Sequence, residues 1–308
     1  MDRLEFKEGL PVPEPIIYTA ESRDLAVVIP LFQGLTYNEK EIDCFVQTSL
    51  AARHSIVANS DVVERGIPVY FFVEDIVYDR LAVPIIDSGI PPELVLKFSS
   101  LPPMSESVRG YLAKKLMVLD DLTLGEYQSF IVIDADMFIC RKSFGEKFRW
   151  EALEGENIGA WGFGRTDDCW QDVPHYWDKY HTISEASEQF HKSCETLNTL
   201  TSLDINEDTT FKNTSGGLLR FVNPLPDGFK DFVLKVMPAA LDDELVFALW
   251  KLYNPDADID RLGLNNEMET KFDGQSKHTL SLIHISEPTR LLSISYAVFC
   301  LKKKKSHT

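Results

Sequence analysis

The strongest constraint on the fold is an apolar run, residues 130–139, that carries two aspartates. It reads Phe-Ile-Val-Ile-Asp-Ala-Asp-Met-Phe-Ile, and its β-branched residues are typical of a buried strand. Two unpaired carboxylates cannot stay in a dry core, because their desolvation costs far more than packing returns. We therefore expect Asp134 and Asp136 to lie where the strand emerges into a cleft. Ligands bind at that end of the strands in an open α/β sheet, and paired oxygen ligands there suit Mg²⁺ or Mn²⁺ carrying phosphates.

The segments around this run predict an α/β fold. We expect strands over residues 25–32, 68–75 and 94–98, with Pro30 and Gly34 ending the first. We expect helices over 41–58, 108–122 and 241–253, the second marked by the apolar stripe Leu112, Leu116, Leu119 and Leu122. Strands that alternate with helices in this way predict a mostly parallel central sheet. Residues 1–24, which contain three prolines, are expected to form an irregular lead-in.

Composition limits the partners and the compartment. The formal net charge is −17, which argues against a nucleic-acid partner because phosphate backbones are bound by Lys and Arg. Before residue 280 the cysteines stand at positions 44, 140, 169 and 194 without a C-x-x-C spacing, which indicates a reducing compartment. The first residues carry no apolar signal region, and no apolar run reaches the roughly 18 residues of a transmembrane span. We expect a cytoplasmic protein.

The last segment, residues 280–308, resembles a translated sequencing adapter. Leu-Ser-Leu-Ile-His-Ile-Ser-Glu-Pro-Thr-Arg at 280–290 is the peptide that a transposase-type adapter encodes, and the lysines at 302–305 match a translated poly-A run. Segments of this kind belong outside any fold argument. We therefore expect one catalytic domain over residues 25–279, truncated at its C-terminus, followed by an artefactual, non-native tail over 280–308.

The residues before the aspartates give the D-x-D pattern its chemical context. Arg109, Lys114 and Lys115 lie on the preceding helical segment, where they could meet diphosphate oxygens. At this point the chain resembles the metal-dependent GT-A glycosyltransferases, in particular the glycogenin-like and lipopolysaccharide galactosyltransferase-like enzymes. The resemblance implies the GT-A (Rossmann-like) nucleotide-diphospho-sugar transferase fold and a hexosyltransferase activity. It also implies Mn²⁺ or Mg²⁺ on Asp134 and Asp136, a nucleotide-sugar donor (a UDP-sugar above all), and a carbohydrate, lipid-linked or protein acceptor.

Further segments extend the resemblance over about residues 25–253. By this resemblance, the exit of the first strand would contact the nucleobase (Pro30, Leu31, Phe32), and the end of the second strand would contact the base or the ribose (Glu74, Asp75). A later segment that resembles the family's N-x-G motif would contact the sugar (Ser215, Gly216, Gly217). Adjacent glycines let a backbone approach a ligand closely. An acidic motif follows at Asp242, Asp243 and Glu244, which would deprotonate the acceptor in an inverting enzyme or orient the sugar in a retaining one. His278 stands where a third metal ligand is expected.

Other functions share parts of this pattern. A haloacid-dehalogenase-type phosphatase also uses a strand ending in D-x-D, but it needs Thr or Val where Phe138 stands and carries the motif near the start of the chain. A sugar nucleotidyltransferase needs a glycine-rich loop after the first strand, which this chain lacks. Four acidic residues match a calcium-binding EF-hand loop (Asp256, Asp258, Asp260, Glu267), although Arg261 stands where that loop needs Gly. A catalytically inactive GT-A binding domain also stays open.

Overall fold

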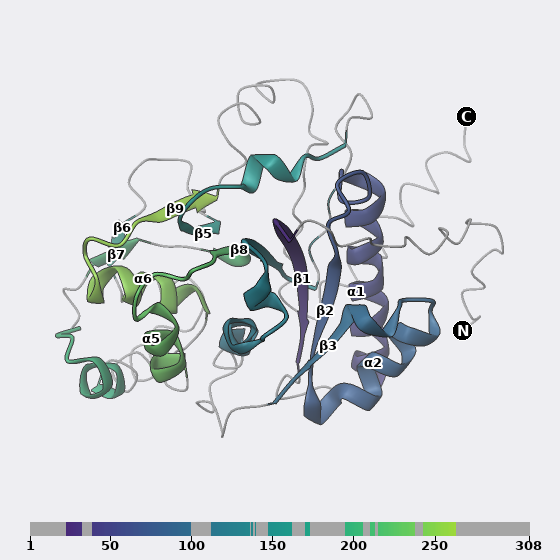
Figure 1. The fold of residues 1–308 in the computed structure, drawn as a ribbon. Helices are drawn as coiled ribbons and strands as arrows, with labels where there is room; N and C mark the ends of the chain where they lie inside the picture. The colour runs from purple at the N-terminus through teal and green to yellow at the C-terminus, as the bar shows by residue number, and fades with distance from the viewer. Residues whose placement is uncertain are drawn as a thin grey trace, which may run out of the picture.

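The computed structural model describes most of the region between residues 23 and 262. The described ranges are 23–32, 39–99, 112–135, 137, 139, 147–161, 170–172, 195–205, 210–212, 215–237 and 243–262. Within them, seven strands form a central sheet in the order β3-β2-β1-β4-β8-β5-β9 (Figure 1). These strands are β1 (Leu25–Leu31), β2 (Val69–Glu74), β3 (Val95–Phe98), β4 (Ser129–Ile133), β5 (Ile158–Trp161), β8 (Ser215–Val222) and β9 (Ile259–Leu262). A separate antiparallel pair joins β6 (Trp170–Asp172) to β7 (Thr210–Lys212).

The first four strands are parallel, and their order reverses between β1 and β4. β1 pairs with β2 on one side and with β4 on the other, and β3 lies outside β2. β8 runs antiparallel to both β4 and β5, and β9 is parallel to β5. The α/β class and the mostly parallel central sheet are thus confirmed. The reversal between β1 and β4 is the kind of topological switch point at which open α/β sheets bind ligands.

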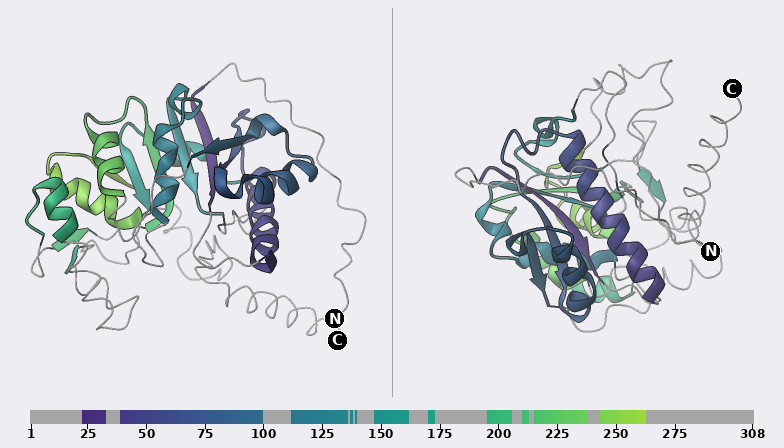
Figure 2. Two further views of the ribbon diagram at one scale, coloured as in Figure 1. Left: turned by 90° about the horizontal axis from the view of Figure 1, so that it is seen from below. Right: turned by 90° about the vertical axis from the view of Figure 1, so that its right-hand side faces the viewer.

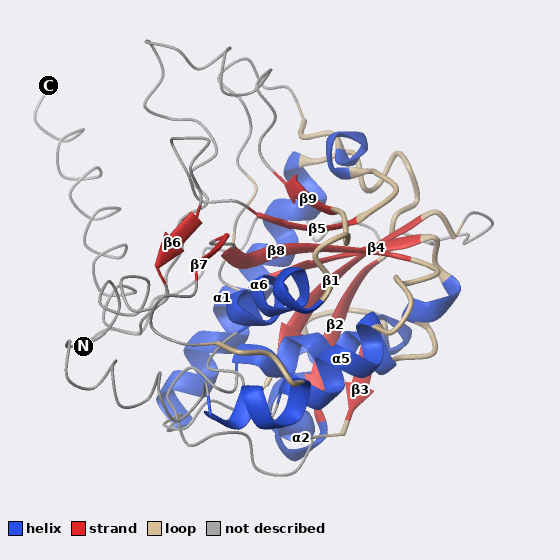
Figure 3. Ribbon diagram, turned by 90° about the vertical axis from the view of Figure 1, so that its left-hand side faces the viewer, coloured by secondary structure: helices blue, strands red, loops and turns tan. Residues whose placement is uncertain are grey.

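Helices cover both faces of the sheet. One face carries α1 (Glu39–Asn59) and α2 (Tyr78–Asp87), and the other carries α5 (Phe229–Val236), α6 (Asp243–Tyr253) and the 3-10 helix η3 (Leu112–Asp120). Figures 1 and 2 show α1 and α2 on the opposite side of β1 from α5 and α6, and Figure 3 shows α5 and α6 in front of the strands. Short 3-10 turns connect these elements: η1 (Asp75–Val77), η2 (Pro92–Leu94), η4 (Leu124–Glu126) and η5 (Trp150–Leu153). Residues 195–201 form a further helical segment.

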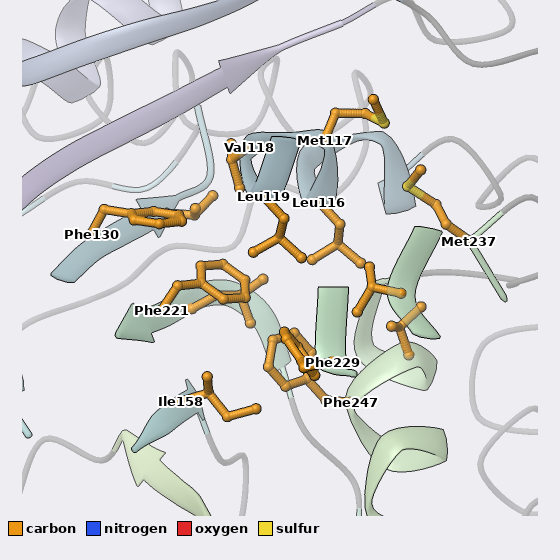
Figure 4. Close-up of a cluster of buried hydrophobic side chains, with 14 of the residues drawn as sticks. Leu116, Met117, Val118, Leu119, Phe130, Ile158, Phe221, Phe229, Met237 and Phe247 are labelled. Carbon is orange, nitrogen blue, oxygen red and sulfur yellow. The ribbon is translucent and has the colours of Figure 1, made fainter. Parts of the chain in front are cut away.

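β1, β2 and β4 are buried on both sides, which explains why they read as continuous apolar runs. In β1, Ala26 and Val28 join the cluster beneath η3, α5 and α6, whereas Val27 and Ile29 join the cluster beneath α1 and α2. Figure 4 shows the first cluster in close-up, with side chains from η3, the strands and both helices meeting in one layer. Its aromatic rings are in contact, as for Phe221 and Phe247, whose centroids lie 5.9 Å apart. This packing fixes η3 against the sheet.

A buried tyrosine pair lies at the amino ends of β2 and β4. The hydroxyls of Tyr70 and Tyr127 are 2.8 Å apart, and both side chains belong to the core. Burial, with a smaller part from the hydrogen bond to Tyr127, raises the pKa of Tyr70 well above its ordinary value. At this end of the sheet, burial therefore favours the neutral form of Tyr70.

The structure corrects several expected boundaries. β4 ends at Ile133, so Asp134 is the first residue after the strand and not part of it. Pro30 lies inside β1 instead of ending it, because the β1–β4 ladder stops at Val28–Val132 and Pro30 needs no hydrogen bond on that side. The segment expected as a helix over 108–122 is described from Leu112 as a 3-10 helix, which ends before Leu122; that side chain is 87% exposed. Among the described residues, no helix is long and apolar enough to span a membrane.

Candidate functional site at the carboxyl ends of β1, β2 and β4

The candidate site lies where the parallel strands end. β1 ends at Leu31, β2 ends at Glu74, and Asp134 is the first residue after β4. The ladder between β1 and β4 runs from Leu25–Ser129 only to Val28–Val132, so the two strands are no longer paired beyond that point. Polar groups at the end of β2 and beyond β4 are therefore placed at the switch point of the sheet.

A buried lysine from η3 holds the Asp134 carboxylate. Lys115 is 2% exposed, and its Nζ donates to Asp134 Oδ1 at 2.5 Å and to the Gly216 carbonyl oxygen at 2.9 Å. Burying an ammonium group is costly unless it is paired and hydrogen-bonded, and both conditions are met here. The Asp134 side chain keeps 20% of its surface exposed. The result is a carboxylate fixed through one oxygen at the rim of the sheet.

The start of β8 closes in on the same turn. The Asp134 amide donates to the Gly217 carbonyl at 3.1 Å, and the Met137 amide donates to the Asp134 carbonyl at 3.0 Å. A Cβ atom at position 217 would lie 2.8 Å from Met137 Sδ and 3.7 Å from Asp134 Oδ2. Glycine at this position lets the backbone of β8 approach the turn.

A second lysine of η3, Lys114, binds the carboxylate at the end of β2. Glu74 is fully buried at the end of β2, and Lys114 Nζ donates to its Oε1 at 2.5 Å. Two successive lysines thus bind two carboxylates, one at the end of β2 and one just after β4. The apolar residues that follow them (Leu116, Met117, Val118, Leu119) pack on the sheet and hold η3 in place (Figure 4).

The structure brings together some of the expected site residues. Glu74 meets Lys114, and Asp134 lies beside Gly216 and Gly217. Pro30 and Leu31 are buried in β1, Asp75 begins η1, and the half-buried Phe32 packs against the core. Three expected residues are described through their backbones only: Ser215 begins β8, and Asp243 and Glu244 begin α6. The remaining predictions, for Arg109, Asp136, Asp242 and His278, lie outside the described residues.

The contact between Lys115 and Asp134 is not among the sequence predictions. Both lysines could be expected either to reach phosphate or to face solvent, and nothing in their identity separates them. A signal does exist in the spacing: Lys115 stands three residues after Leu112 and four before Leu119, which places it on the apolar stripe. A lysine on a buried stripe needs an acid, and Asp134 is such an acid.

Among the described residues, Asp134 is suited to supply one ligand of a metal site. Asp134 offers Oδ2 while Oδ1 is held by Lys115, and metal-binding carboxylates are commonly fixed by hydrogen bonds in this way. No group of three or more His, Cys, Asp or Glu side chains gathers around a possible ion among the described residues. The calcium-loop alternative is wrong, because Asp260 lies in β9 and pairs with the buried Arg220.

Comparisons with known proteins give only a distant likeness. No family model matches the chain, and no curated protein matches it. Among solved structures, the mannosyltransferase Ktr4p from S. cerevisiae aligns at 9% identity and a TM-score of 0.36, over 74% of this chain and 65% of its own. The same enzyme in complex with GDP aligns at 10% identity and a TM-score of 0.31, over 74% of this chain and 66% of its own. The chain thus spans less than two thirds of the first of these structures, and the likeness is too weak to assign a function.

Proposed function

We propose that this chain is a GT-A-type glycosyltransferase domain that moves a sugar from a nucleoside-diphosphate donor to an acceptor hydroxyl. One observation carries the proposal: the Asp134 carboxylate, fixed by buried Lys115 and backed by Gly216 and Gly217, stands at the switch point between β1 and β4. That position is where an open α/β sheet takes its ligands. The D-x-D pattern would supply carboxylates for a metal ion on the diphosphate, and the glycine pair would let the backbone approach the sugar.

In this proposal the chain holds the donor through its diphosphate. Asp134 and Asp136 are the residues that would bind Mn²⁺ or Mg²⁺, which supplies positive charge to the departing diphosphate when bound. Lys115 orients Asp134 so that one carboxylate oxygen stays available. The Gly216 and Gly217 backbone gives the sugar a close approach.

The η3 lysines differ in how they would contribute. Lys114 is bound to Glu74, so any phosphate contact it makes shares its ammonium with that carboxylate. Its main role in this proposal is to brace η3 against the end of β2. Arg109 stays the predicted cation for the diphosphate, and Asp75 the predicted contact with base or ribose.

The acceptor side is assigned to the start of α6. This helix begins with Asp243 and Glu244, and Asp242 precedes it in the chain. In an inverting reaction Asp243 or Glu244 would take the proton from the acceptor hydroxyl. In a retaining reaction these acids would orient the sugar. The acceptor class, whether carbohydrate, lipid-linked or protein, stays a prediction.

Thermal unfolding of the full chain with nucleotides tests the proposal. UDP, GDP and CMP are added separately, each with and without Mn²⁺, and a ligand at 100 times its Kd should add about 2.7 kcal/mol of stability. We expect a metal-dependent shift with one nucleotide, with UDP as the predicted one, and no shift in Asp134→Asn. Asp258→Asn is the matched control, because exposed Asp258 belongs to two other D-x-D patterns and should leave the shift intact. No shift with any nucleotide would contradict the proposal.

A second experiment separates the transferase from the phosphatase alternative. Asp136→Asn should abolish sugar transfer from the stabilising donor while the chain keeps its wild-type unfolding temperature. Hydrolysis of p-nitrophenyl phosphate should be absent in the wild type. Phosphatase activity that Asp134→Asn removes would replace the transferase assignment with the haloacid-dehalogenase-type one.

A further inference from the structure

Side chains of α1 hold the backbone of the segment that follows β4. Ile139 is buried, and its amide donates to Ser55 Oγ at 3.0 Å while its carbonyl accepts from Asn59 Nδ2 at 2.6 Å. The Ser55 hydroxyl in turn donates to the Ala52 carbonyl at 2.7 Å. Both backbone polar groups of one buried residue are therefore satisfied by a single helix. Buried backbone groups without such partners are rare, because leaving one unsatisfied is costly.

Met137, which contacts the site, stands two positions before Ile139 in the chain. Met137 is fully buried, its amide donates to the Asp134 carbonyl at 3.0 Å, and its sulfur lies where a side chain at Gly217 would stand. Asp134 itself is bound to Gly217 through its amide. The turn that carries the carboxylate is thus fixed to β8 on one side and, through Ile139, to α1 on the other.

The same end of α1 also holds the chain where it returns. The Phe148 amide donates to the Asn59 carbonyl at 2.8 Å, and the Asp61 amide donates to the Phe148 carbonyl at 2.9 Å. Trp150 Nε1 donates to Ser60 Oγ at 2.8 Å. The last turn of α1 and the two residues after it therefore bind Ile139 on one side and Phe148 on the other. This arrangement fixes both ends of the intervening stretch to one rigid element.

We propose that Ser55 and Asn59 are positioning residues for the Asp134 turn. Among the described residues, their side chains bond to the backbone of Ile139 and Ala52, so both act on the candidate site through the backbone of Ile139 and the buried side chain of Met137. The part of this inference that concerns a ligand rests on the proposed function, because the ligand would be the metal–nucleotide pair at Asp134. Removal of a group that orients a metal-binding residue commonly lowers affinity or activity by about 10- to 100-fold.

The test compares four substitutions along α1. Ser55→Ala removes the acceptor for Ile139, and Asn59→Asp replaces the donor with an acceptor of the same shape. Ser49→Ala is the matched control, because the Ser49 hydroxyl makes the same kind of intrahelical bond, to the Val46 carbonyl at 2.9 Å, and Ser49 is buried whereas Ser55 is partly buried. The conservative variant Ser55→Thr keeps the hydroxyl and should restore wild-type behaviour.

The first readout is independent of any ligand. We expect Ser55→Ala to speed hydrogen exchange at the Ile139 and Met137 amides, with the β1 amides unchanged, and Ser49→Ala to leave Ile139 and Met137 as in the wild type. Met137 is the decisive amide, because its hydrogen bond is to Asp134 and not to α1. Unchanged exchange at Met137 would overturn the inference, whatever the function of the chain.

The second readout uses Mn²⁺ with whichever of UDP, GDP or CMP stabilises the wild type. We expect Ser55→Ala and Asn59→Asp to weaken binding by about tenfold, and Ser49→Ala and Ser55→Thr to bind as the wild type does. Equal weakening by Ser49→Ala and Ser55→Ala would assign the effect to the helix in general and overturn the inference. If the wild type binds none of the three nucleotides, the proposed function fails, and the exchange experiment alone decides the positioning role.

Discussion

Two buried cations, Arg220 and Lys115, hold two ends of the sheet in different ways. Arg220 in β8 is 2% exposed; it donates to the carbonyls of Leu153 and Asn157 at 2.8 and 2.9 Å and forms an ion pair with Asp260 of β9. Lys115 is equally buried, but it reaches from a helix to the carboxylate that follows β4. One cation joins strands at the edge of the sheet, and the other joins a helix to the end of a central strand.

The positions of the two cations indicate that the Arg220–Asp260 pair stabilises the fold and that the Lys115–Asp134 pair supports the candidate site. Leu153 and Asn157 precede β5, and β5 runs in the same direction as β4 because both are antiparallel to β8. Arg220 therefore acts at the amino end of β5, whereas Lys115 acts at the carboxyl end of β4. Ligands of open α/β sheets bind at carboxyl ends. We infer that Arg220 supports the far edge and that Lys115 supports the candidate site.

Arg220→Met should give the largest loss of stability. It removes the donor from the Leu153 and Asn157 carbonyls and from the partly exposed Asp260, and each buried acceptor left unsatisfied costs about 1–3 kcal/mol. The expected result is a lower midpoint in chemical denaturation, with nucleotide binding retained at temperatures where the variant is folded. Loss of binding in the folded variant would remove the distinction between the two cations.

Lys115→Met should have a smaller effect on stability and a larger one on binding. Methionine fills the same space, so the cost is that of leaving Asp134 and the Gly216 carbonyl without the ammonium, about 2 kcal/mol. The metal-dependent shift with nucleotide should disappear at the same time. Retention of the full shift would show that Asp134 needs no orienting partner, and the double variant with Asp134→Asn measures the coupling of the two residues.

Two glycines allow the comparison to be repeated without changing a charge. A Cβ at Gly155 would lie 2.6 Å from both terminal nitrogens of Arg220, and one at Gly217 would lie 2.8 Å from Met137 Sδ. Each Gly→Ala change forces a neighbour to move, at a cost of about 1–3 kcal/mol. Denaturation should report a loss for both, and nucleotide titration a loss only for Gly217→Ala. Loss of nucleotide binding in Gly155→Ala, with binding retained in Gly217→Ala, would contradict the distinction between the Arg220 and Lys115 regions.

The smallest effect is expected at Leu122. Its side chain is 87% exposed, although the sequence places it on the apolar stripe of the preceding helix. Leu122→Asp should change the free energy of unfolding by no more than about 0.5 kcal/mol, as is usual for surface substitutions. A loss several times larger in chemical denaturation would mean that the stripe extends through Leu122 after all.

The elements that sequence predicted well are those with a continuous local pattern. β1 and β2 are continuous apolar runs, and the observed bounds of these two strands, of β3 and of α1 fall within a few residues of the expected ones. β5 and β9 are four residues each and are defined by pairing with strands distant in the chain, so no local pattern announces them. The antiparallel direction of β8 also depends on that long-range pairing.

The position of Asp134 could be predicted from the sequence, because it is set by the cost of desolvating a carboxylate. Asp134 had to leave the core, and it does so directly after β4. The choice of Lys115 over Lys114 as its partner follows from the place of Lys115 on the apolar stripe, a signal in the spacing that the sequence prediction did not use. The contact of Ile139 with Ser55 and Asn59 joins residues 80 or more positions apart and leaves no trace in either segment.

The most direct test of the account is a hydrogen-exchange footprint of the wild-type chain with Mn²⁺ and the nucleotide that stabilises it. We expect slower exchange in the segments around the carboxyl ends of β1 and β4, at residues 29–32, 112–116, 134–139 and 215–217. We expect no change around Arg220 and its partners, at residues 153–159 and 259–262. Protection confined to the Arg220 side, or none at all in the presence of bound nucleotide, would contradict the placement of the donor site.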